Sequence, residues 1–276
     1  MSSEEEPSKE LSDDSSGQFL DKRWLKKLDR TSQEIAQHIG WNRKTFGEVF
    51  DQKTLIRLSK LFSDGTLLQM DFPISTGKEA NLFRATTPKN KLVAIKIYRT
   101  SNLTFKHISS YIEGDPRFRN YIKNRREILD EWAKKEFKNL TRLSDISVRV
   151  PKPIKRLHNI VVMDYIGTKD KPAPMIKDVE LDDPKAVYDE LMSFVSKMYK
   201  DRIVHADLSP FNILYYRGKP YIIDVGQAVL LDHPQALEFL KRDIKNLVWY
   251  FKKYGIKGDE EKIFTKITKI KKETSS

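Results

Sequence analysis

Residues 203–225 place three polar side chains among short apolar runs, and this restricts the folds that the chain can adopt. The segment reads IVHADLSPFNIL, continues through YYRGKP and ends in YIIDV. The runs NILYY and YIIDV flank RGKP, which predicts a β-hairpin. Asp207 and Asn212 precede the hairpin and Asp224 ends its second strand, so each lies beside a buried strand.

Asp207, Asn212 and Asp224 are the residue types that phosphoryl transfer from a nucleotide requires. One carboxylate orients or deprotonates the attacking group, while a second carboxylate and an amide oxygen hold magnesium. Asparagine is suitable because its carbonyl oxygen coordinates a metal without adding negative charge. A lone aspartate in such a place is more often a turn or cap residue, but the spacing of all three predicts a phosphoryl-transfer site.

A lysine in an earlier strand predicts a buried partner for its amine. Lys96 lies within VAIKIY, and strand alternation places it on the same face as Ala94 and Tyr98. Phosphates and an acid from the following helix would satisfy the ammonium group. The alternative is an edge-strand lysine whose amine reaches solvent.

The helix expected over about 125–143 offers three acids to Lys96, namely Glu127, Glu131 and Glu136. Glu136 comes one residue before Phe137 and four before Leu140, which belong to the apolar stripe of this helix. We therefore predict that Glu136 lies on the inward edge of the helix and pairs with Lys96.

A short loop before Lys96, within PISTGKEANLF, is suited to phosphate binding. Gly77 lets the backbone approach a phosphate closely, and Ser75, Thr76 and Lys78 supply donors. An ordinary hairpin turn explains a single glycine equally well. The hypothesis depends on the position of the loop, nineteen residues before Lys96.

The order of the expected elements predicts a two-lobed α+β protein with a cleft between the lobes. Its expected parts are a disordered acidic tail (1–17), an N-terminal helical extension (18–66), an N-lobe (67–163) with a flexible loop (99–124), and a C-lobe (164–276) that ends in a Lys-rich helix. Asp51 should cap a helix that Gly65 ends, and Asp183 should cap a helix with Pro184 at its first position.

The composition limits the classes of partner and compartment. The net charge is +12, and residues 1–17 carry six acids and one base, so the remaining chain carries +17. Such a basic body favours a polyanionic partner such as RNA. The chain has no cysteine, no apolar run of about 18 residues and no secretory signal, so we expect a cytoplasmic protein without a membrane partner.

Several motifs together resemble those of one kinase family. HADLSPFN resembles the H-R-D-x-x-x-x-N loop of protein kinases, IDVG the D-F-G metal site and VAIK the strand lysine. STGKEAN, IEGDPRFRNY, WAKKEFKNL and IIDVGQAV closely resemble the RIO family of atypical serine/threonine kinases, in particular its first subfamily in archaeal form. The likeness covers roughly residues 45–255. It implies a kinase-like fold with an antiparallel N-lobe sheet plus one helix and a reduced, mainly helical C-lobe.

The resemblance also implies a role for each candidate residue. Asp207 would be the catalytic base, and Asn212 and Asp224 would hold magnesium or manganese. Asp224 would also accept a phosphate, as in an ATPase-like switch. The implied ATP-binding residues are Lys96 and Glu136 as an ion pair, Ser75, Gly77 and Lys78 at the phosphates, the backbone of Asp164 and Ile166 at adenine, and Met163 at the back of the pocket.

Departures from ordinary protein kinases affect the expected substrate. Ala206 stands where an arginine would pair with a phosphorylated activation loop, and no A-P-E segment follows Asp224. The activation segment and peptide platform are therefore expected to be missing. We hypothesise autophosphorylation within 99–124, although a mobile insertion without a phosphosite is equally compatible; the candidates are Ser101, Thr104, Ser109 and Ser110.

For the biological role, the family resemblance implies maturation of the small ribosomal subunit, with pre-ribosomal RNA as a partner. Two other functions stay open. A nucleotide-binding scaffold with negligible turnover would suit the basic body, and a small-molecule phosphotransferase has a similar H-x-D-x-x-x-x-N loop. The second would need additional helices around an acceptor pocket, for which the chain has little material.

Overall fold

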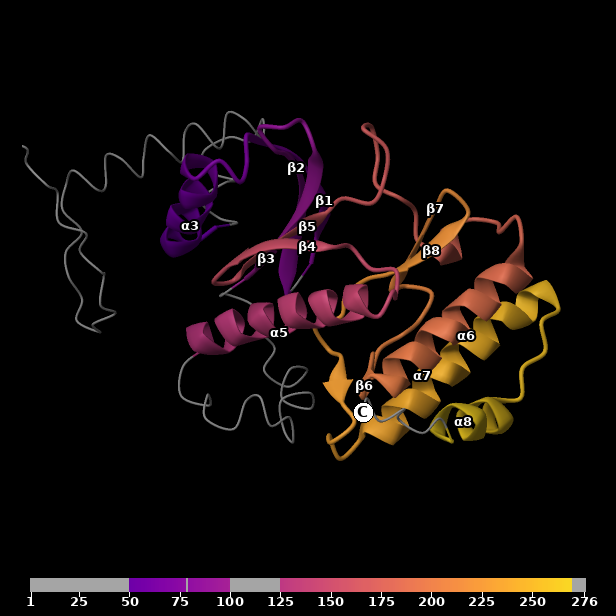
Figure 1. Cartoon of the computed structure of the whole chain (residues 1–276). Helices are drawn as coiled ribbons and strands as arrows, with labels where there is room; N and C mark the ends of the chain where they lie inside the picture. The colour runs from indigo at the N-terminus through magenta and orange to yellow at the C-terminus, as the bar shows by residue number, and fades with distance from the viewer. Residues whose placement is uncertain (1–49, 78, 100–124, 270–276) are drawn as a thin grey trace, which may run out of the picture.

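A five-stranded antiparallel sheet and a helical half make up the computed structural model of the chain (Figure 1), which describes residues 50–77, 79–99 and 125–269. The strand order is β1-β2-β3-β5-β4. The strands are β1 (Gln69–Thr76), β2 (Ala80–Thr86), β3 (Leu92–Tyr98), β4 (Pro153–Leu157) and β5 (Ile160–Asp164). The predicted two-lobed α+β fold is confirmed, and strand 92–98 has the predicted bounds.

The two faces of β3 belong to different cores because successive side chains point to opposite sides of a strand. Val93, Ile95 and Ile97 pack beneath helix α3 (Gln52–Ser63), whereas Ala94 and Tyr98 pack on the side of helix α5 (Arg125–Asp145). The sheet is thus covered by one helix on each face. Lys96 shares the α5 face with Ala94 and Tyr98, as the alternation predicts.

Helix α3 begins and ends where the sequence predicts. The Asp51 side chain accepts a hydrogen bond of 2.7 Å from the Thr54 N–H, and Gly65 follows the helix with a φ of +72°. An N-cap acceptor satisfies an amide that the helix itself leaves free, and glycine tolerates the left-handed backbone. The apolar face of α3 is fully buried at Leu58 and Leu61.

The second half of the chain is mainly helical. It contains α6 (Pro184–Lys200), α7 (Ala236–Phe251), α8 (Glu260–Thr268), the short helices η2 (Ile176–Asp178) and η3 (Lys252–Tyr254), and two small sheets that pair β6 (Ile203–Val204) with β9 (Val229–Leu230) and β7 (Ile213–Tyr216) with β8 (Lys219–Ile222). Helices α6 and α7 run side by side in Figure 1. The cap of α6 by Asp183 is confirmed, with Pro184 as its first residue.

Two details differ from the sequence prediction. Strand β4 was not expected, because PIKRL is polar at alternate positions and forms an edge that only β5 covers. Asp224 does not end its strand: β8 ends at Ile222, and Asp224 lies two residues beyond it with a φ of +57°. A left-handed aspartate cannot continue a strand, so the chain turns at that point.

Parts of the expected organisation lie outside the described residues. These are the acidic tail (1–17), most of the N-terminal extension, nearly all of the loop 99–124 and the last residues of the Lys-rich end. In α8, Ile267 is buried and Ile263 is partly buried against the main core, which fits an amphipathic helix. The helices that the structure describes include none with the length and apolarity of a membrane span.

Removing a buried side chain from α3 should destabilise the sheet that it covers. Leu58 is fully buried, so Leu58→Ala leaves a cavity and is expected to lower the free energy of unfolding by about 3 kcal/mol. Urea unfolding measures this. The matched control is Lys53→Ala on the exposed face of the same helix. Equal unfolding midpoints for the two variants would contradict the packing of α3 against the sheet.

Candidate active site

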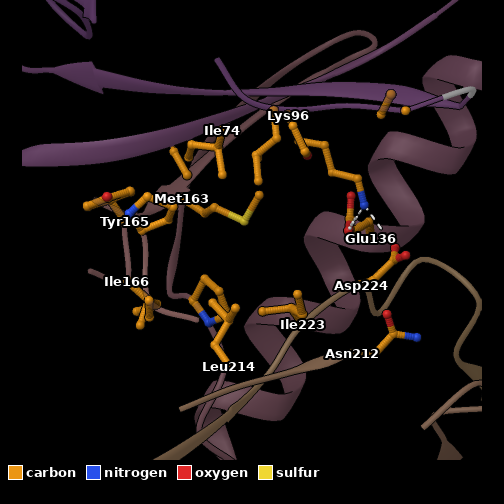
Figure 2. Close-up of a pocket in the computed structure, with 18 of the residues that line it drawn as sticks. Ile74, Lys96, Glu136, Met163, Tyr165, Ile166, Asn212, Leu214, Ile223 and Asp224 are labelled. Atoms are coloured by element: carbon orange, nitrogen blue, oxygen red, sulfur yellow. Dashed lines mark hydrogen bonds and ion pairs between the residues drawn. The ribbon is translucent and has the colours of Figure 1, made fainter. Parts of the chain in front are cut away.

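A cleft of about 700 Å³ separates the sheet from the helical half. Figure 2 shows its apolar walls facing each other, with Ile74 and Met163 from the sheet side opposite Leu214 and Ile223 from the helical half. An apolar slot with a few polar groups at one end is typical of sites for flat ligands. Of the predicted residues, those that line the cleft are Ser75, Gly77, Lys96, Glu136, Met163, Asp164, Ile166, Asn212 and Asp224.

The ammonium group of Lys96 joins three separate elements at the polar end of this cleft. Its Nζ donates to Glu136 Oε1 at 2.6 Å and to Asp224 Oδ1 at 2.9 Å (Figure 2). Burial acts to lower the pKa of Lys96, but the carboxylates of Asp224 and Glu136 outweigh it and raise the pKa well above its usual value. Lys96 is therefore a permanent cation in this site.

Glu136 is the acid that pairs with Lys96, as predicted. Glu127 is exposed, and Glu131 pairs with Lys134 at 2.9 Å. Glu136 is 2% exposed and also accepts a hydrogen bond from the Tyr98 hydroxyl. Burial and the Glu136 carboxylate raise the pKa of Tyr98, so its hydroxyl remains a donor. The sequence placed Tyr98 on this face, but its contact with Glu136 was not predicted.

Asn212 and Asp207 are joined by their side chains. Asn212 Nδ2 donates to the Asp207 carbonyl at 2.8 Å and to Asp207 Oδ2 at 2.9 Å. Asp207 does not itself line the cleft, so its connection with the cleft runs through Asn212. Burial raises the pKa of Asp207 and outweighs the opposing effect of the hydrogen bond from Asn212. An aspartate with a raised pKa is a better proton acceptor once ionised.

A divalent cation fits the oxygen atoms of Asn212 and Asp224. Because Asn212 Nδ2 is committed to Asp207, the atom that would coordinate a cation is Oδ1, which has no hydrogen bond within the described residues. Burial acts to raise the pKa of Asp224, but Lys96 holds it below its usual value, so the carboxylate is ionised. Magnesium prefers such oxygens together with substrate phosphates. In the described part of the chain, no three His, Cys, Asp or Glu side chains form a metal cluster.

A buried aspartate of α7 shapes the loop that carries Asp207. Asp243 Oδ2 accepts from the Ala206 N–H at 2.9 Å, and Oδ1 accepts from the Leu208 N–H at 2.8 Å. These two amides flank Asp207, and Ala206 has a φ of +68°. Asp243 was missed by sequence analysis. The sequence feature that could have revealed it is an aspartate at a position on the apolar face of a helix, where charged groups are rare unless they are paired.

A buried histidine connects this loop with the chain before Asp224. The Asp207 N–H donates to His205 Nδ1 at 3.3 Å, and His205 Nε2 lies 3.1 Å from the Ile223 carbonyl. Burial lowers the pKa of His205, so the ring is neutral. Since Nδ1 accepts a hydrogen bond, the ring proton is on Nε2, which donates a hydrogen bond to the Ile223 carbonyl.

The turn after Asp224 packs closely on α5. Asn139 Nδ2 donates to the Val225 carbonyl at 2.8 Å. A Cβ atom at Gly226 would lie 3.0 Å from Trp132 Nε1, so any larger residue would require Trp132 to shift by a few tenths of an ångström. Helix α5 therefore supplies Glu136 to Lys96 and also fixes the turn that carries Asp224.

The far end of the cleft offers backbone groups. The Asp164 N–H donates to the Lys152 carbonyl at 2.8 Å, and the Ile166 carbonyl accepts from the Ala173 N–H at 2.9 Å. The Ile166 N–H forms no backbone hydrogen bond with the described residues, and Ile166 lines the cleft. Lys78, the remaining predicted residue, lies outside the described residues.

Comparison with known proteins identifies relatives of this chain. The family model of the RIO domain matches residues 81–263. The chain is 50% identical over 182 residues to the RIO-type serine/threonine-protein kinase Rio1 of Thermoplasma acidophilum, which covers 66% of this chain and 96% of that protein. It is 43% identical over 220 residues to the human serine/threonine-protein kinase RIO1, covering 78% of this chain but only 39% of the human protein.

Solved structures with a similar fold include the Rio2 kinase of Chaetomium thermophilum. One structure has a TM-score of 0.65 at 22% identity and covers 80% of this chain and 69% of that one. A second, a complex of that kinase with ADP/Mg²⁺-phosphoaspartate, has a TM-score of 0.61 at 22% identity and covers 79% of this chain and 67% of that one. These similarities confirm the kinase-like fold.

Replacing Asp243 should destabilise the helical half of the protein. Asp243→Ala leaves the buried N–H groups of Ala206 and Leu208 without acceptors, and we expect a loss of about 3 kcal/mol in the free energy of unfolding. Thermal and urea unfolding measure the change. Glu238→Ala, at an exposed position of the same helix, is the control. A variant with unchanged stability would show that Asp243 does not hold the loop.

Proposed function

Because this chain belongs to the RIO family of serine/threonine protein kinases, we propose that its cleft binds ATP with magnesium and transfers the terminal phosphate to a hydroxyl group. The observation that carries this proposal is the convergence of Lys96, Glu136, Asp224 and Asn212 at one end of an apolar slot. Lys96 supplies a fixed positive charge, and Asn212 and Asp224 supply two oxygen atoms for a metal ion. Phosphoryl transfer depends on such positioning and charge stabilisation.

Each residue has a distinct part in the proposed reaction. Lys96, held by Glu136, neutralises phosphate charge. Asp207 orients the acceptor hydroxyl and takes its proton, and its raised pKa suits that role. Asn212 and Asp224 would hold the magnesium, which when bound offsets the negative charge that develops on the phosphates. Manganese has similar ligand preferences and is an alternative cation.

Adenine would occupy the apolar end of the slot. The Asp164 N–H is already bonded to Lys152, so this residue would offer its carbonyl group, whereas Ile166 would offer its N–H. Met163 lines the same region. Ser75, Gly77 and Lys78 would contact the phosphates, as the sequence predicts.

Transfer should depend on Asp207. Asp207→Asn removes the proton acceptor and is expected to reduce phosphoryl transfer by about 10³-fold, with ATP affinity changed by less than about threefold. A single-turnover assay with γ-labelled ATP measures transfer, and mass spectrometry maps incorporated phosphate, for which we propose residues 99–124. Asp189→Asn, on an exposed helix face, serves as the control.

The outcome of that experiment separates the remaining alternatives. Equal transfer by the wild type and Asp207→Asn would contradict the assignment of the base. Tight ATP binding without turnover in either protein would favour a nucleotide-gated scaffold instead. Transfer to a small alcohol rather than to protein would favour a small-molecule phosphotransferase.

We also propose that the protein can act as an ATPase-like switch through Asp224. The carboxylate is ionised, its side chain is 39% exposed at the edge of the cleft, and its Oδ1 accepts from Lys96. The related Rio2 structure contains a phosphoaspartate. Transfer of the γ-phosphate of ATP to an Asp224 oxygen would release ADP, and hydrolysis of the resulting acyl phosphate would release phosphate and restore the carboxylate, so ATP would be consumed without a protein acceptor.

We further propose a role in small ribosomal subunit maturation, with pre-ribosomal RNA as the partner. The net charge of +12 supports binding to phosphate groups. If the contacts are electrostatic, affinity for an rRNA fragment should fall about 10³-fold between roughly 50 and 200 mM salt, for six or more phosphates contacted. Filter binding measures this. A flat response to salt would exclude electrostatic docking.

A further inference from the structure

Two aromatic side chains, one in the loop that carries Asp207 and one on helix α7, are exposed. Among the large hydrophobic residues of the described chain, Trp249 and Phe211 are the most exposed, at 69% and 64%. Phe211 belongs to the loop itself, one residue before Asn212, and borders the cleft. Exposed aromatic groups next to a catalytic loop are typical of a binding surface rather than of random surface composition.

Hydrogen bonds from α7 place Trp249 along this loop. Arg242 donates to the Ala206 carbonyl, and Asn246 Nδ2 donates to the Leu208 carbonyl at 3.0 Å. Trp249 follows Asn246 by three residues and Arg242 by seven, so it lies on the same side of the helix, one turn further along. The loop and the exposed side of α7 thus run next to each other.

Helix η2 contacts both the end of α7 that carries Trp249 and the loop that carries Phe211. Tyr250, the residue after Trp249, donates its hydroxyl to the Ile176 carbonyl at 2.5 Å. Lys177, the residue after Ile176, has its Nζ 5.1 Å from the centre of the Phe211 ring. Helix η2 therefore contacts α7 through Tyr250 and the Asp207 loop through Phe211. We name Phe211, Lys177 and Trp249 the aromatic strip.

The surroundings of the aromatic strip are basic. Lys245 and Lys253 are exposed one turn before and after Trp249, and Lys177 is itself exposed. Two groups of acids lie near these lysines: Asp178 is 2.5 Å from Lys177, and Glu260 and Glu261 of α8 line a shallow hollow together with Lys245. The Lys253 Nζ lies 4.4 Å from the Tyr250 ring centre. A partner that fits this surface would carry acidic groups together with an apolar or aromatic side chain.

We propose that the aromatic strip docks the phosphate-accepting protein through an acidic segment with an apolar side chain near its serine or threonine. This inference rests on the proposed kinase function. A polypeptide is favoured over RNA because the chain belongs to a family of serine/threonine protein kinases, and the loop that carries Phe211 also carries Asp207, four residues earlier. With just residues 225–235 between Asp224 and α7, the chain has no long segment for a peptide platform, and the strip supplies a surface in its place.

The test compares synthetic peptides of equal length as substrates of the full chain. One is acidic with phenylalanine beside a single serine, one has alanine in place of that phenylalanine, and one has lysine in place of the acids. The proposal predicts that the acidic phenylalanine peptide has the highest kcat/KM, by about tenfold over each of the others. Equal values for all three peptides would overturn it.

Variants connect this preference to the aromatic strip. Trp249→Ala should lower kcat/KM for the acidic phenylalanine peptide about tenfold, mainly through KM, and leave ATP hydrolysis unchanged. Lys177→Glu should reverse the preference towards the lysine peptide. The control is Leu237→Ala, which is 50% exposed on the same helix but lies about three turns before Trp249 and about 120° around the helix axis from it. If Trp249→Ala and Leu237→Ala behave alike, the strip is not the docking surface.

Two further measurements separate other causes of failure. A single-stranded RNA oligonucleotide that competes with the peptide in the wild type but not in Trp249→Ala would show that the strip binds nucleic acid, which overturns the proposal. Loss of Asp207-dependent ATP turnover would instead indicate failure of the kinase assignment. Intact ATP turnover without discrimination between peptides would reject the strip alone.

Discussion

The ion pairs that Lys96 forms with Glu136 and Asp224 are the interactions on which the rest of the site depends. A strand, a helix and a turn each contribute one group to them, at separations of 2.6 Å and 2.9 Å. Lys96 is 15% exposed and Glu136 is 2% exposed, so neither charge can rely on water. Buried charges of this kind are tolerated only when they are paired, and removal of one leaves the other uncompensated. The ion pair of Lys96 with Asp224 therefore connects the sheet with the helical half across the cleft.

Backbone strain near the site is maintained by hydrogen bonds from outside it. Ala206 and Asp224 both have positive φ angles, +68° and +57°, which residues with side chains seldom adopt. Asp243 holds the amides on both sides of Asp207, and Asn139 holds the turn after Asp224. Strained backbone persists where its surroundings over-determine it. Helices α5 and α7 thus act as rigid supports for the reacting groups.

Much of the local structure could be predicted because it depends on neighbouring residues. The cap of α3 at Asp51, the start of α6 at Pro184 and the bounds of β3 follow from short-range rules of capping and alternation. Edge strand β4 escaped prediction because its pattern is weak without its partner. The position of Asp224 was assigned to a strand because an apolar run does not reveal where the backbone turns left-handed.

The sequence alone determined the residue types of the candidate site, because Lys96, Glu136, Asp207, Asn212 and Asp224 stand in motifs whose spacing limits their chemistry. It also indicated which of three glutamates faces inward, since helical periodicity is a local property. Only the tertiary structure decided what supports them. The contacts of Asp243 with the loop and of Tyr98 with Glu136 join residues far apart in the chain, at separations of 35 to 38 positions. No local pattern encodes such contacts, because they arise from the packing of whole elements against one another.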